Sequence, residues 1–260
     1  MKVTILGCGS SSGVPSVALG WGKCDPGNPK NRRRRASILV EEGQGEKTTT
    51  LLVDTSPDLR EQMLDVGLKR LDAVLYTHAH ADHIHGIDEL REITRLLKTD
   101  LPVYAMAETM RCLETRFGYV FKPIPADGYV YRPWLRSHVI EPTERFAVGN
   151  IAVDSFLQQH GHVQTLGYNF GPVIYSTDVS DLPPASKAVI KGAKVWIVGA
   201  ISDMPFFTHA HVAKVLDWVA ELRPHRTIIT HMSNSLDYET LAARLPVGVT
   251  PAFDGLVVEA

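Results

Sequence analysis

One short stretch decides the fold of this chain: Thr77-His78-Ala79-His80-Ala81-Asp82-His83-Ile84-His85-Gly86. Four side chains within six positions are of types that bind divalent metals, namely His78, His80, Asp82 and His83. Such crowding is costly in an ordinary fold, because these polar groups must be desolvated together and protonated imidazoles repel one another. A bound cation removes that cost, since neutral imidazoles and a carboxylate are ligands that it prefers. The stretch therefore predicts the core of a metal site.

The composition is that of an ordinary soluble protein. The chain has 260 residues, of which 44% are hydrophobic and 22% charged, and this length allows a sizeable core. The formal charge of -2 argues against a general nucleic-acid binder, which usually carries a basic excess. Three widely spaced cysteines imply no disulfide framework, and we find no signal peptide and no apolar stretch of about 18 residues. We therefore expect a cytoplasmic protein with no membrane partner.

Short β-branched runs alternate with helical stretches along the whole chain, which predicts one α/β domain spanning residues 1–260. We expect strands at 3–6, 37–40, 50–53, 73–76, 103–105, 151–157, 173–176, 195–198 and 227–230, and helices at 57–66, 88–97, 108–117 and 210–222. Gly43-Gln44-Gly45-Glu46 has the composition of a hairpin turn. The aromatic-rich segment 118–150 predicts strands or a hairpin, and it is not expected to be a linker.

Three further candidate ligands follow predicted strands, as His78 does. They are His160, Asp178 and His231. Loops at one end of a sheet can bring side chains to a common point, so we expect these residues to close one site with the opening stretch. A carboxylate such as Asp178 can bridge two cations, which a neutral imidazole cannot. Two cations about 3.5–4 Å apart can hold a bridging hydroxide and neutralise a phosphoryl or carbonyl oxygen, so the chain is expected to be a two-metal hydrolase.

The ligand pattern resembles that of the metallo-β-lactamase superfamily, and Leu52-Val53-Asp54 is similar to its first short motif. Segments 6–15, 28–37 and 230–233 further resemble the PhnP-like phosphodiesterases, relatives of tRNase Z that are associated with the carbon–phosphorus lyase pathway. This resemblance covers nearly the whole chain. It implies an α/β fold of four layers, an αββα sandwich with two mixed sheets.

The resemblance also implies a role for each residue of the site. One metal, zinc or manganese, would be held by His78, His80 and His160, and a second by Asp82, His83 and His231, with Asp178 bridging and Asp54 in support. His209, in a Thr208-His209 pair, would be the general acid, with His211 as a substitute, so the implied catalytic residues are His209, Asp178 and Asp82. His162 competes with His160, but the offset to Gly167-Tyr168 favours His160.

One departure from the PhnP-like pattern concerns a separate structural zinc site, built from clustered cysteines and a downstream histidine. This chain keeps only Cys24 there and has Asn234 at the downstream position. Two such residues cannot make the closed four-ligand site that structural zinc prefers, so we expect no structural zinc. What holds residues 17–23 in place is then an open question.

The leading hypothesis is a binuclear phosphodiesterase in which a metal-bridging hydroxide attacks a small cyclic phosphate, of the phosphoribosyl 1,2-cyclic or nucleoside 2′,3′-cyclic type. The alternatives are tRNA 3′-end processing, lactone or thioester hydrolysis at the same metals, and a non-catalytic metal-dependent binding module. No protruding basic arm for tRNA is evident, so no stable nucleic-acid complex is expected. By analogy with the family we expect a homodimer.

The sequence alone does not decide the role of two basic or polar segments. The run Arg32 to Arg35 is either a solvated turn or a hold on a substrate phosphate, for which the planar guanidinium is suited. Ser10 to Gly13 follows a strand, and its backbone N–H groups are candidates for cradling a phosphate.

Overall fold

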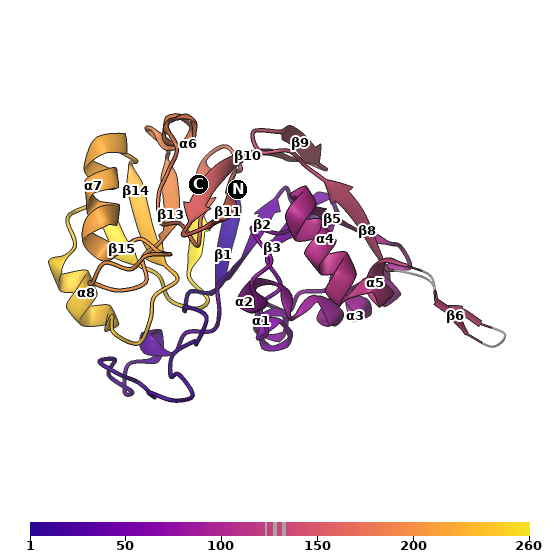
Figure 1. Ribbon diagram of the computed structural model, residues 1–260, viewed down its shortest axis with the longest axis horizontal. Helices are drawn as coiled ribbons and strands as arrows, with labels where there is room; N and C mark the ends of the chain where they lie inside the picture. Colours follow the sequence, from indigo (N-terminus) through magenta and orange to yellow (C-terminus); the bar gives the residue numbers. More distant parts are fainter. Residues whose placement is uncertain (123, 127–128, 132–133) are drawn as a thin grey trace.

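Among the residues that the computed structural model describes (1–122, 124–126, 129–131 and 134–260), two seven-stranded mixed sheets form the centre of the molecule (Figure 1). The first sheet has the order β16-β1-β2-β3-β4-β5-β8. Its strands, in that order, are Val257–Glu259, Lys2–Gly7, Ser37–Glu42, Thr49–Val53, Ala73–Leu75, Leu101–Ala105 and Leu135–Val139.

The second sheet has the order β15-β14-β13-β12-β11-β10-β9. Its strands, in that order, are Val249–Pro251, Arg226–Thr230, Val195–Gly199, Val173–Ser176, Val163–Asn169, Ile151–His160 and Arg145–Val148. The chain ends lie side by side, because β1 pairs with β16.

Helices cover the outer faces of both sheets, which gives the predicted four layers (Figure 1). Beside the first sheet lie α1 (Leu59–Val66), α2 (Ala81–Ile84), α3 (Leu90–Leu97), α4 (Ala107–Arg116) and α5 (Gly118–Phe121). Beside the second lie α6 (Pro184–Ile190), α7 (Val212–Leu222) and α8 (Tyr238–Arg244). Short 3₁₀ turns are η1 (Pro29–Asn31), η2 (Gly45–Lys47) and η3 (Ile87–Glu89).

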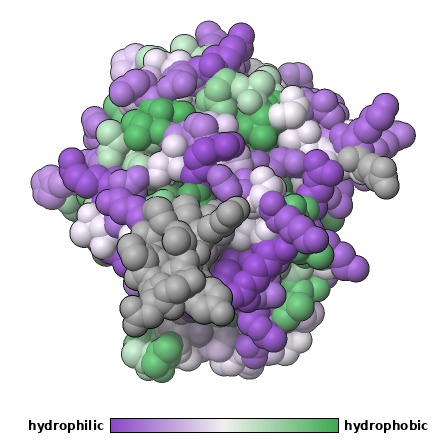
Figure 2. Space-filling model, turned by 90° about the vertical axis from the view of Figure 1, so that its right-hand side faces the viewer, coloured by the Kyte–Doolittle hydropathy of each residue, from purple (hydrophilic) through white to green (hydrophobic). Residues whose placement is uncertain are grey.

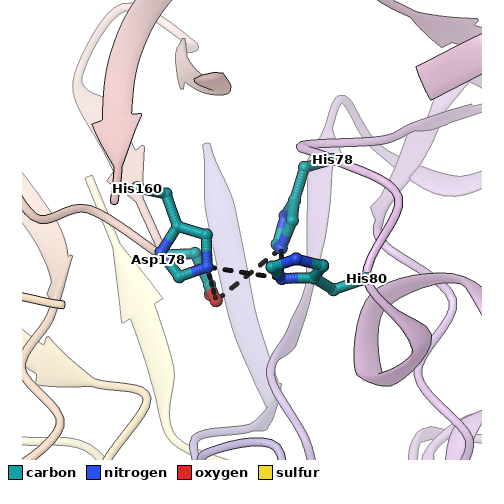
Figure 3. A group of neighbouring side chains, drawn as sticks. All are labelled: His78, His80, His160 and Asp178. Carbon is teal, nitrogen blue, oxygen red and sulfur yellow. Dashed lines mark hydrogen bonds and ion pairs between the residues drawn. The ribbon is translucent and has the colours of Figure 1, made fainter. Parts of the chain in front are cut away.

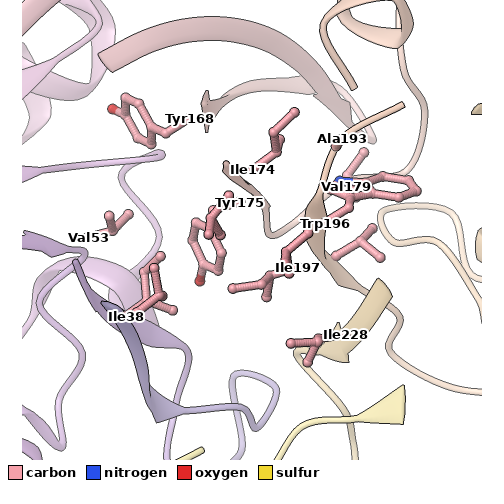
Figure 4. Close-up of a cluster of buried hydrophobic side chains, with 14 of the residues drawn as sticks. Ile38, Val53, Tyr168, Ile174, Tyr175, Val179, Ala193, Trp196, Ile197 and Ile228 are labelled. Carbon is pink, nitrogen blue, oxygen red and sulfur yellow. The ribbon is translucent and has the colours of Figure 1, made fainter. Parts of the chain in front are cut away.

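The central strands β2 and β3 of the first sheet are largely buried on both faces, and alternate residues pack into different hydrophobic cores. On β2 and β3, Ile38, Val40 and Val53 face the second sheet, whereas Leu39 and Leu52 face the helices. Figure 4 shows Ile38 and Val53 across from residues of the second sheet. Each fully buried aliphatic side chain contributes roughly 1.5–3 kcal/mol, so the sandwich is a rigid support for the loops at its edge.

The segment 118–150 differs in part from the expectation. Tyr119 to Phe121, predicted to be extended, form the short helix α5, in which Val120 is buried against the helix-side core. The expected hairpin is present as β6 (Ile124–Ala126) paired with β7 (Tyr129–Tyr131), and it projects from the body (Figure 1). The side chains of Tyr129 and Tyr131 lie outside the described part. The two strands contain no basic residue, and the sequence has Lys122 and Arg132 at the two ends of the hairpin, whereas an arm for gripping tRNA would need a basic surface.

Buried and partly buried polar contacts join the long loop before β2 to the segment after β14, and we call this group of residues the loop tie (Asn31, Arg33, Cys24, Asn234 and Asp237). Arg33 is 2% exposed and donates to Ser233 O at 3.2 Å and to Asn31 Oδ1 at 3.1 Å. Asn234 donates to Gly20 O at 3.2 Å and accepts from the backbone N–H of Lys23 at 2.8 Å. These contacts answer what holds residues 17–23 in a chain that lacks the zinc-binding cysteines.

Candidate metal centre

The candidate ligands gather at one edge of the sandwich because strand directions bring them there. In the second sheet β12, β13 and β14 are parallel, and β10 runs the same way because it and β12 are both antiparallel to β11. His160 is the last residue of β10, whereas Asp178 and His231 follow β12 and β14. From the first sheet, the stretch after β4 completes the site.

The first cluster consists of His78, His80, His160 and Asp178 (Figure 3). His80 Nδ1 lies 2.9 Å from His78 Nε2 and 3.3 Å from His160 Nε2. Asp178 Oδ2 lies 3.7 Å from His78 Nε2 and 3.8 Å from His160 Nε2. Figure 3 shows the three rings and the carboxylate turned toward one small volume.

The second cluster consists of Asp82, His83, Asp178 and His231. Asp178 Oδ1 lies 3.1 Å from His83 Nε2 and 3.2 Å from His231 Nε2, and Asp82 Oδ2 lies 3.3 Å from His83 Nε2. One oxygen of Asp178 therefore faces each cluster, which is the arrangement that a bridging carboxylate requires. In both clusters the possible ligand atoms lie within 4.8 Å of one another.

The buried polar atoms of these residues indicate that the site suits divalent cations. His83 Nε2 and both ring nitrogens of His231 are buried and make no hydrogen bond to any described residue. A buried polar group without a partner costs about 1–3 kcal/mol. Two of these nitrogens, His83 Nε2 and His231 Nε2, face carboxylates, and this donor set matches the tetrahedral N/O ligation of zinc and also permits manganese. Ligation by these residues, and the number of metals, stay predictions.

Neighbouring groups hold the rings in place. Asp54 accepts from Thr77 N–H and Thr77 Oγ1, each at 2.8 Å, and its Oδ2 lies 2.7 Å from His83 Nδ1. On the other side, His160 Nδ1 lies 2.6 Å from Thr208 O. Such partners fix which ring nitrogen faces a metal. Sequence reasoning found Asp54 but missed both threonines, although the repeated Thr-His pairs 77–78 and 208–209 are a visible signal.

The backbone is strained at three of these positions. Asp54, Asp178 and His231 have left-handed φ angles of 62°, 48° and 56°. A non-glycine residue in this region costs on the order of 1–3 kcal/mol, and such residues cluster where function fixes the geometry. Each is the first or second residue after a strand, so the sharp turn aims the side chain back across the sheet edge.

Burial and charge set the ionisation of the centre. Burial lowers the pKa of His78 well below its usual value and that of His160 to about 4, so both rings are neutral at pH 7 and able to bind a metal. Burial alone would raise the pKa of Asp178, but the imidazoles around it hold that pKa well below its usual range. Burial disfavours a charged His83, yet the three carboxylates around it raise its pKa well above the usual value.

His209 lies at the rim of the centre. Its Nε2 is 3.2 Å from Asp178 Oδ2, its Nδ1 is 2.7 Å from Thr208 Oγ1, and its ring stacks on His231 at 5.0 Å. Its side chain is 14% exposed, so it contacts both the metal ligands and solvent. His211, the possible substitute, precedes α7 and belongs to neither cluster.

The remaining histidines lie elsewhere. His162, the competitor of His160, packs on Phe207 at 4.8 Å on the far side of a turn at Gly161. His85 packs edge-on against Phe117, His138 stacks on Tyr104, and His225 is exposed. Of His160 and His162, the structure thus brings His160 into the first cluster.

The fold and the site agree with the comparisons with known proteins. The family model of the β-lactamase superfamily domain matches residues 49–232. A crystal structure described as a new diphosphatase from the PhnP family is 32% identical, with a TM-score of 0.89, over 99% of this chain and 96% of that one. The chain belongs to the metallo-β-lactamase superfamily and, within it, to the PhnP family.

Two curated relatives of this family member are longer proteins. The octanoyltransferase of Porphyromonas gingivalis is 30% identical over 98% of this chain and 51% of its own length. The exodeoxyribonuclease YycJ of Bacillus anthracis is 26% identical over 64% of this chain and 55% of its own length. The chain thus spans about half the length of these relatives, and their names describe the longer proteins.

Two further observations concern the helices and one face of the molecule. Each described helix falls short of the length and apolarity that a membrane span requires. Figure 2 shows the face on the side of α4 and β8, and its coloured part is mainly hydrophilic with small separate hydrophobic patches. The homodimer and the cytoplasmic location stay predictions.

Proposed function

We propose that this protein is a binuclear metal-dependent phosphodiesterase that hydrolyses small cyclic phosphates of the phosphoribosyl 1,2-cyclic or nucleoside 2′,3′-cyclic type. The observation that carries the proposal is Asp178, whose two oxygens face two clusters of metal-binding side chains while His209 adjoins the same carboxylate. Membership of the PhnP family supports phosphate chemistry. The acidic net charge and the apolar sequences of β6 and β7 favour a small substrate over tRNA.

Each cluster has a defined role in this proposal. His78, His80 and His160 would hold one cation, Asp82, His83 and His231 the other, and Asp178 both. When bound, two divalent cations supply a water of lowered pKa and neutralise charge on phosphoryl oxygens.

His209 is positioned to supply the proton that a departing alkoxide needs. Its Nδ1 lies 2.7 Å from Thr208 Oγ1, which orients the ring so that Nε2 is the nitrogen that faces the centre. Protonation of the leaving oxygen by such a group is worth about 10²–10⁴ in rate. Asp54 and Thr77 keep His83 oriented throughout.

The test is metal analysis of the purified protein together with a substrate panel. We expect two equivalents of zinc or manganese, and hydrolysis of cyclic phosphates that exceeds hydrolysis of lactones, thioesters and single-stranded DNA. Preferential cleavage of a lactone or a thioester would mean that the protein hydrolyses a carbonyl substrate. Degradation of DNA would mean that it is a nuclease, as the name of the exodeoxyribonuclease relative suggests for that protein. A protein that binds metal but cleaves none of these would be a binding module.

A further inference from the structure

The loop between β13 and α7 presents apolar side chains to solvent beside the metal centre, and we call residues 202–209 the aromatic loop. Met204, Phe206 and Phe207 are 73%, 59% and 64% exposed. Of the eight phenylalanines in the chain, only these two are exposed. Single exposed apolar residues are ordinary, but a group of them marks a surface that binds something apolar.

The aromatic loop is fixed at its neck by backbone hydrogen bonds. The N–H of Ile201 donates to Ala210 O at 3.0 Å. The N–H of Val212 donates to Ser202 O at 2.9 Å, and the Ser202 hydroxyl donates to Met204 O at 2.8 Å. The exposed rings therefore project from a built turn, whose position the sheet edge determines.

Both rings of the loop lie against histidines near the centre. The ring centroid of Phe206 is 6.1 Å from that of His209, and the centroid of Phe207 is 4.8 Å from that of His162. Gly161 allows the second contact, because a β-carbon there would lie only 3.0 Å from Phe207 Cε1. The loop thus packs closely on the end of β10 and keeps its outer faces open.

The position of the loop indicates which part of a substrate it would touch. His209 faces Asp178 and is the proposed proton donor to the leaving oxygen. Because Phe206 adjoins the same imidazole, an occupant of the aromatic loop lies on the leaving-group side of the centre. Aromatic side chains offer a large apolar contact area, so this side suits an alcohol with an apolar body.

We propose that Phe206 and Phe207 bind the leaving alcohol, and that the protein also hydrolyses acyclic phosphodiesters whose leaving alcohol is apolar, such as an alkylphenol. In this hydrolysis the oxygen of one water bonds to phosphorus as the bond from phosphorus to the leaving oxygen breaks. His209 gives a proton to the leaving oxygen, and a proton of that water replaces it on the ring. The inference rests on the proposed phosphodiesterase function and adds a leaving-group class to the cyclic phosphates.

The kinetic test compares methyl phenyl phosphate with methyl 4-butylphenyl phosphate, because the butyl chain adds apolar surface and hardly changes the acidity of the leaving phenol. The metal-loaded wild type is expected to prefer the second by roughly 10-fold in kcat/KM, since the chain is partly buried against the rings. The double variant Phe206→Ala/Phe207→Ala should lose that preference, whereas Phe206→Leu should keep part of it. The matched control is Leu64→Ala, which removes an equally exposed side chain from α1 and should keep the full preference.

A binding measurement separates this inference from the proposed function. Phenylphosphonate and 4-butylphenylphosphonate are titrated calorimetrically into metal-loaded wild type, the double variant and Leu64→Ala. Roughly 10-fold tighter binding of the butyl compound that is lost only in the double variant supports the inference, even if the wild type cleaves no cyclic phosphate. Equal affinity of the wild type for the two phosphonates, or a preference that survives in the double variant, overturns the inference and leaves hydrolysis of cyclic phosphates untouched.

Discussion

Two regions of this molecule gather polar side chains away from solvent, and they differ in how many of those side chains have hydrogen-bond partners. In the loop tie, Asn31 uses both ends of its amide, donating to Asp237 Oδ2 at 2.7 Å and accepting from Tyr238 N–H at 2.8 Å and from Arg33. In the metal centre, both ring nitrogens of His231 are buried without a hydrogen bond to any described residue. Among the side chains of the tie only Arg33 Nε lacks a partner in the described part of the chain, whereas in the centre three ring nitrogens of two neighbouring histidines lack one.

This difference separates polar residues that hold the structure from those that bind a ligand. Buried polar groups normally find partners, so an unpartnered set that converges on one point needs an explanation outside the chain. The centre also stores backbone strain at Asp54, Asp178 and His231, while no residue of the loop tie has a left-handed φ. Changes in the centre should therefore abolish function, and changes in the tie should cost stability.

The largest effect is expected from Asp178→Asn, which removes the charge that both clusters share. We expect hydrolysis of cyclic phosphates to fall by more than about 10⁴-fold, beyond the range for loss of a general acid, because both cations lose a ligand. Metal content, measured by plasma mass spectrometry, should fall below two equivalents. A variant that keeps two metals and near-normal turnover would show that Asp178 is a structural carboxylate, like Asp237 in the tie.

His209→Ala is expected to have the next largest effect, because it removes a proton donor and no metal ligand. Turnover of substrates with alkoxide leaving groups should fall by about 10²–10⁴-fold, with metal content unchanged. A nitrophenyl diester, whose leaving group departs without a proton, should be cleaved at close to the wild-type rate. Equal losses on both substrates would count against the acid role and place His209 with the supporting residues.

The gathering of the candidate ligands could be predicted from the sequence because these residues obey a local rule, while their binding of metal stays a prediction. Each ligand follows a short apolar strand, and the strand ends at one edge of a sandwich meet by topology. The choice between His160 and His162 was harder, because only the turn at Gly161 sends the second ring to Phe207.

The tie could not be predicted, since its contacts join residues about 200 positions apart through side-chain to backbone hydrogen bonds that leave no periodic pattern. Arg33 is one of four like neighbours in the sequence, and only the fold distinguishes the buried one. The helix α5 was missed for a related reason, because the aromatic residues Tyr119 and Phe121 favour strands locally while tertiary packing decides.

Arg33→Met is expected to lower the free energy of unfolding without changing the metal content. The change removes a charged donor from Ser233 O and another from Asn31 Oδ1, although each acceptor keeps one backbone donor, so the free energy of unfolding should fall by about 3 kcal/mol. Urea unfolding measures this loss. The matched control is Arg34→Met, which breaks one exposed ion pair and should cost less than about 0.5 kcal/mol. Metal content should stay at the wild-type level in both variants, and loss of metal in Arg33→Met alone would mean that tie and centre are one unit.

The smallest effect is expected from the pH dependence of the tie. Partial burial disfavours ionisation of Asp237, but the backbone N–H groups of Thr240 and Asp25 and the amide of Asn31 outweigh it and lower the pKa to about 2. Because the folded pKa lies below the unfolded value of 3.8, this carboxylate stabilises the fold above about pH 4 and loses that contribution as the pH falls toward 2. Allowing for solvent screening, the contribution is about 1 kcal/mol.

Urea unfolding of metal-free wild type and Asp237→Asn between pH 2 and 6 tests this, since metal-free protein excludes acid release of the cations from the comparison. The variant should be less stable than wild type near pH 6, and the gap should close toward pH 2, because the acid carboxyl and the amide then carry the same charge. If the difference in free energy of unfolding between wild type and variant stays constant with pH, Asp237 acts in the tie through hydrogen-bond geometry alone. The charge of the carboxylate would then contribute nothing to the stability of the tie.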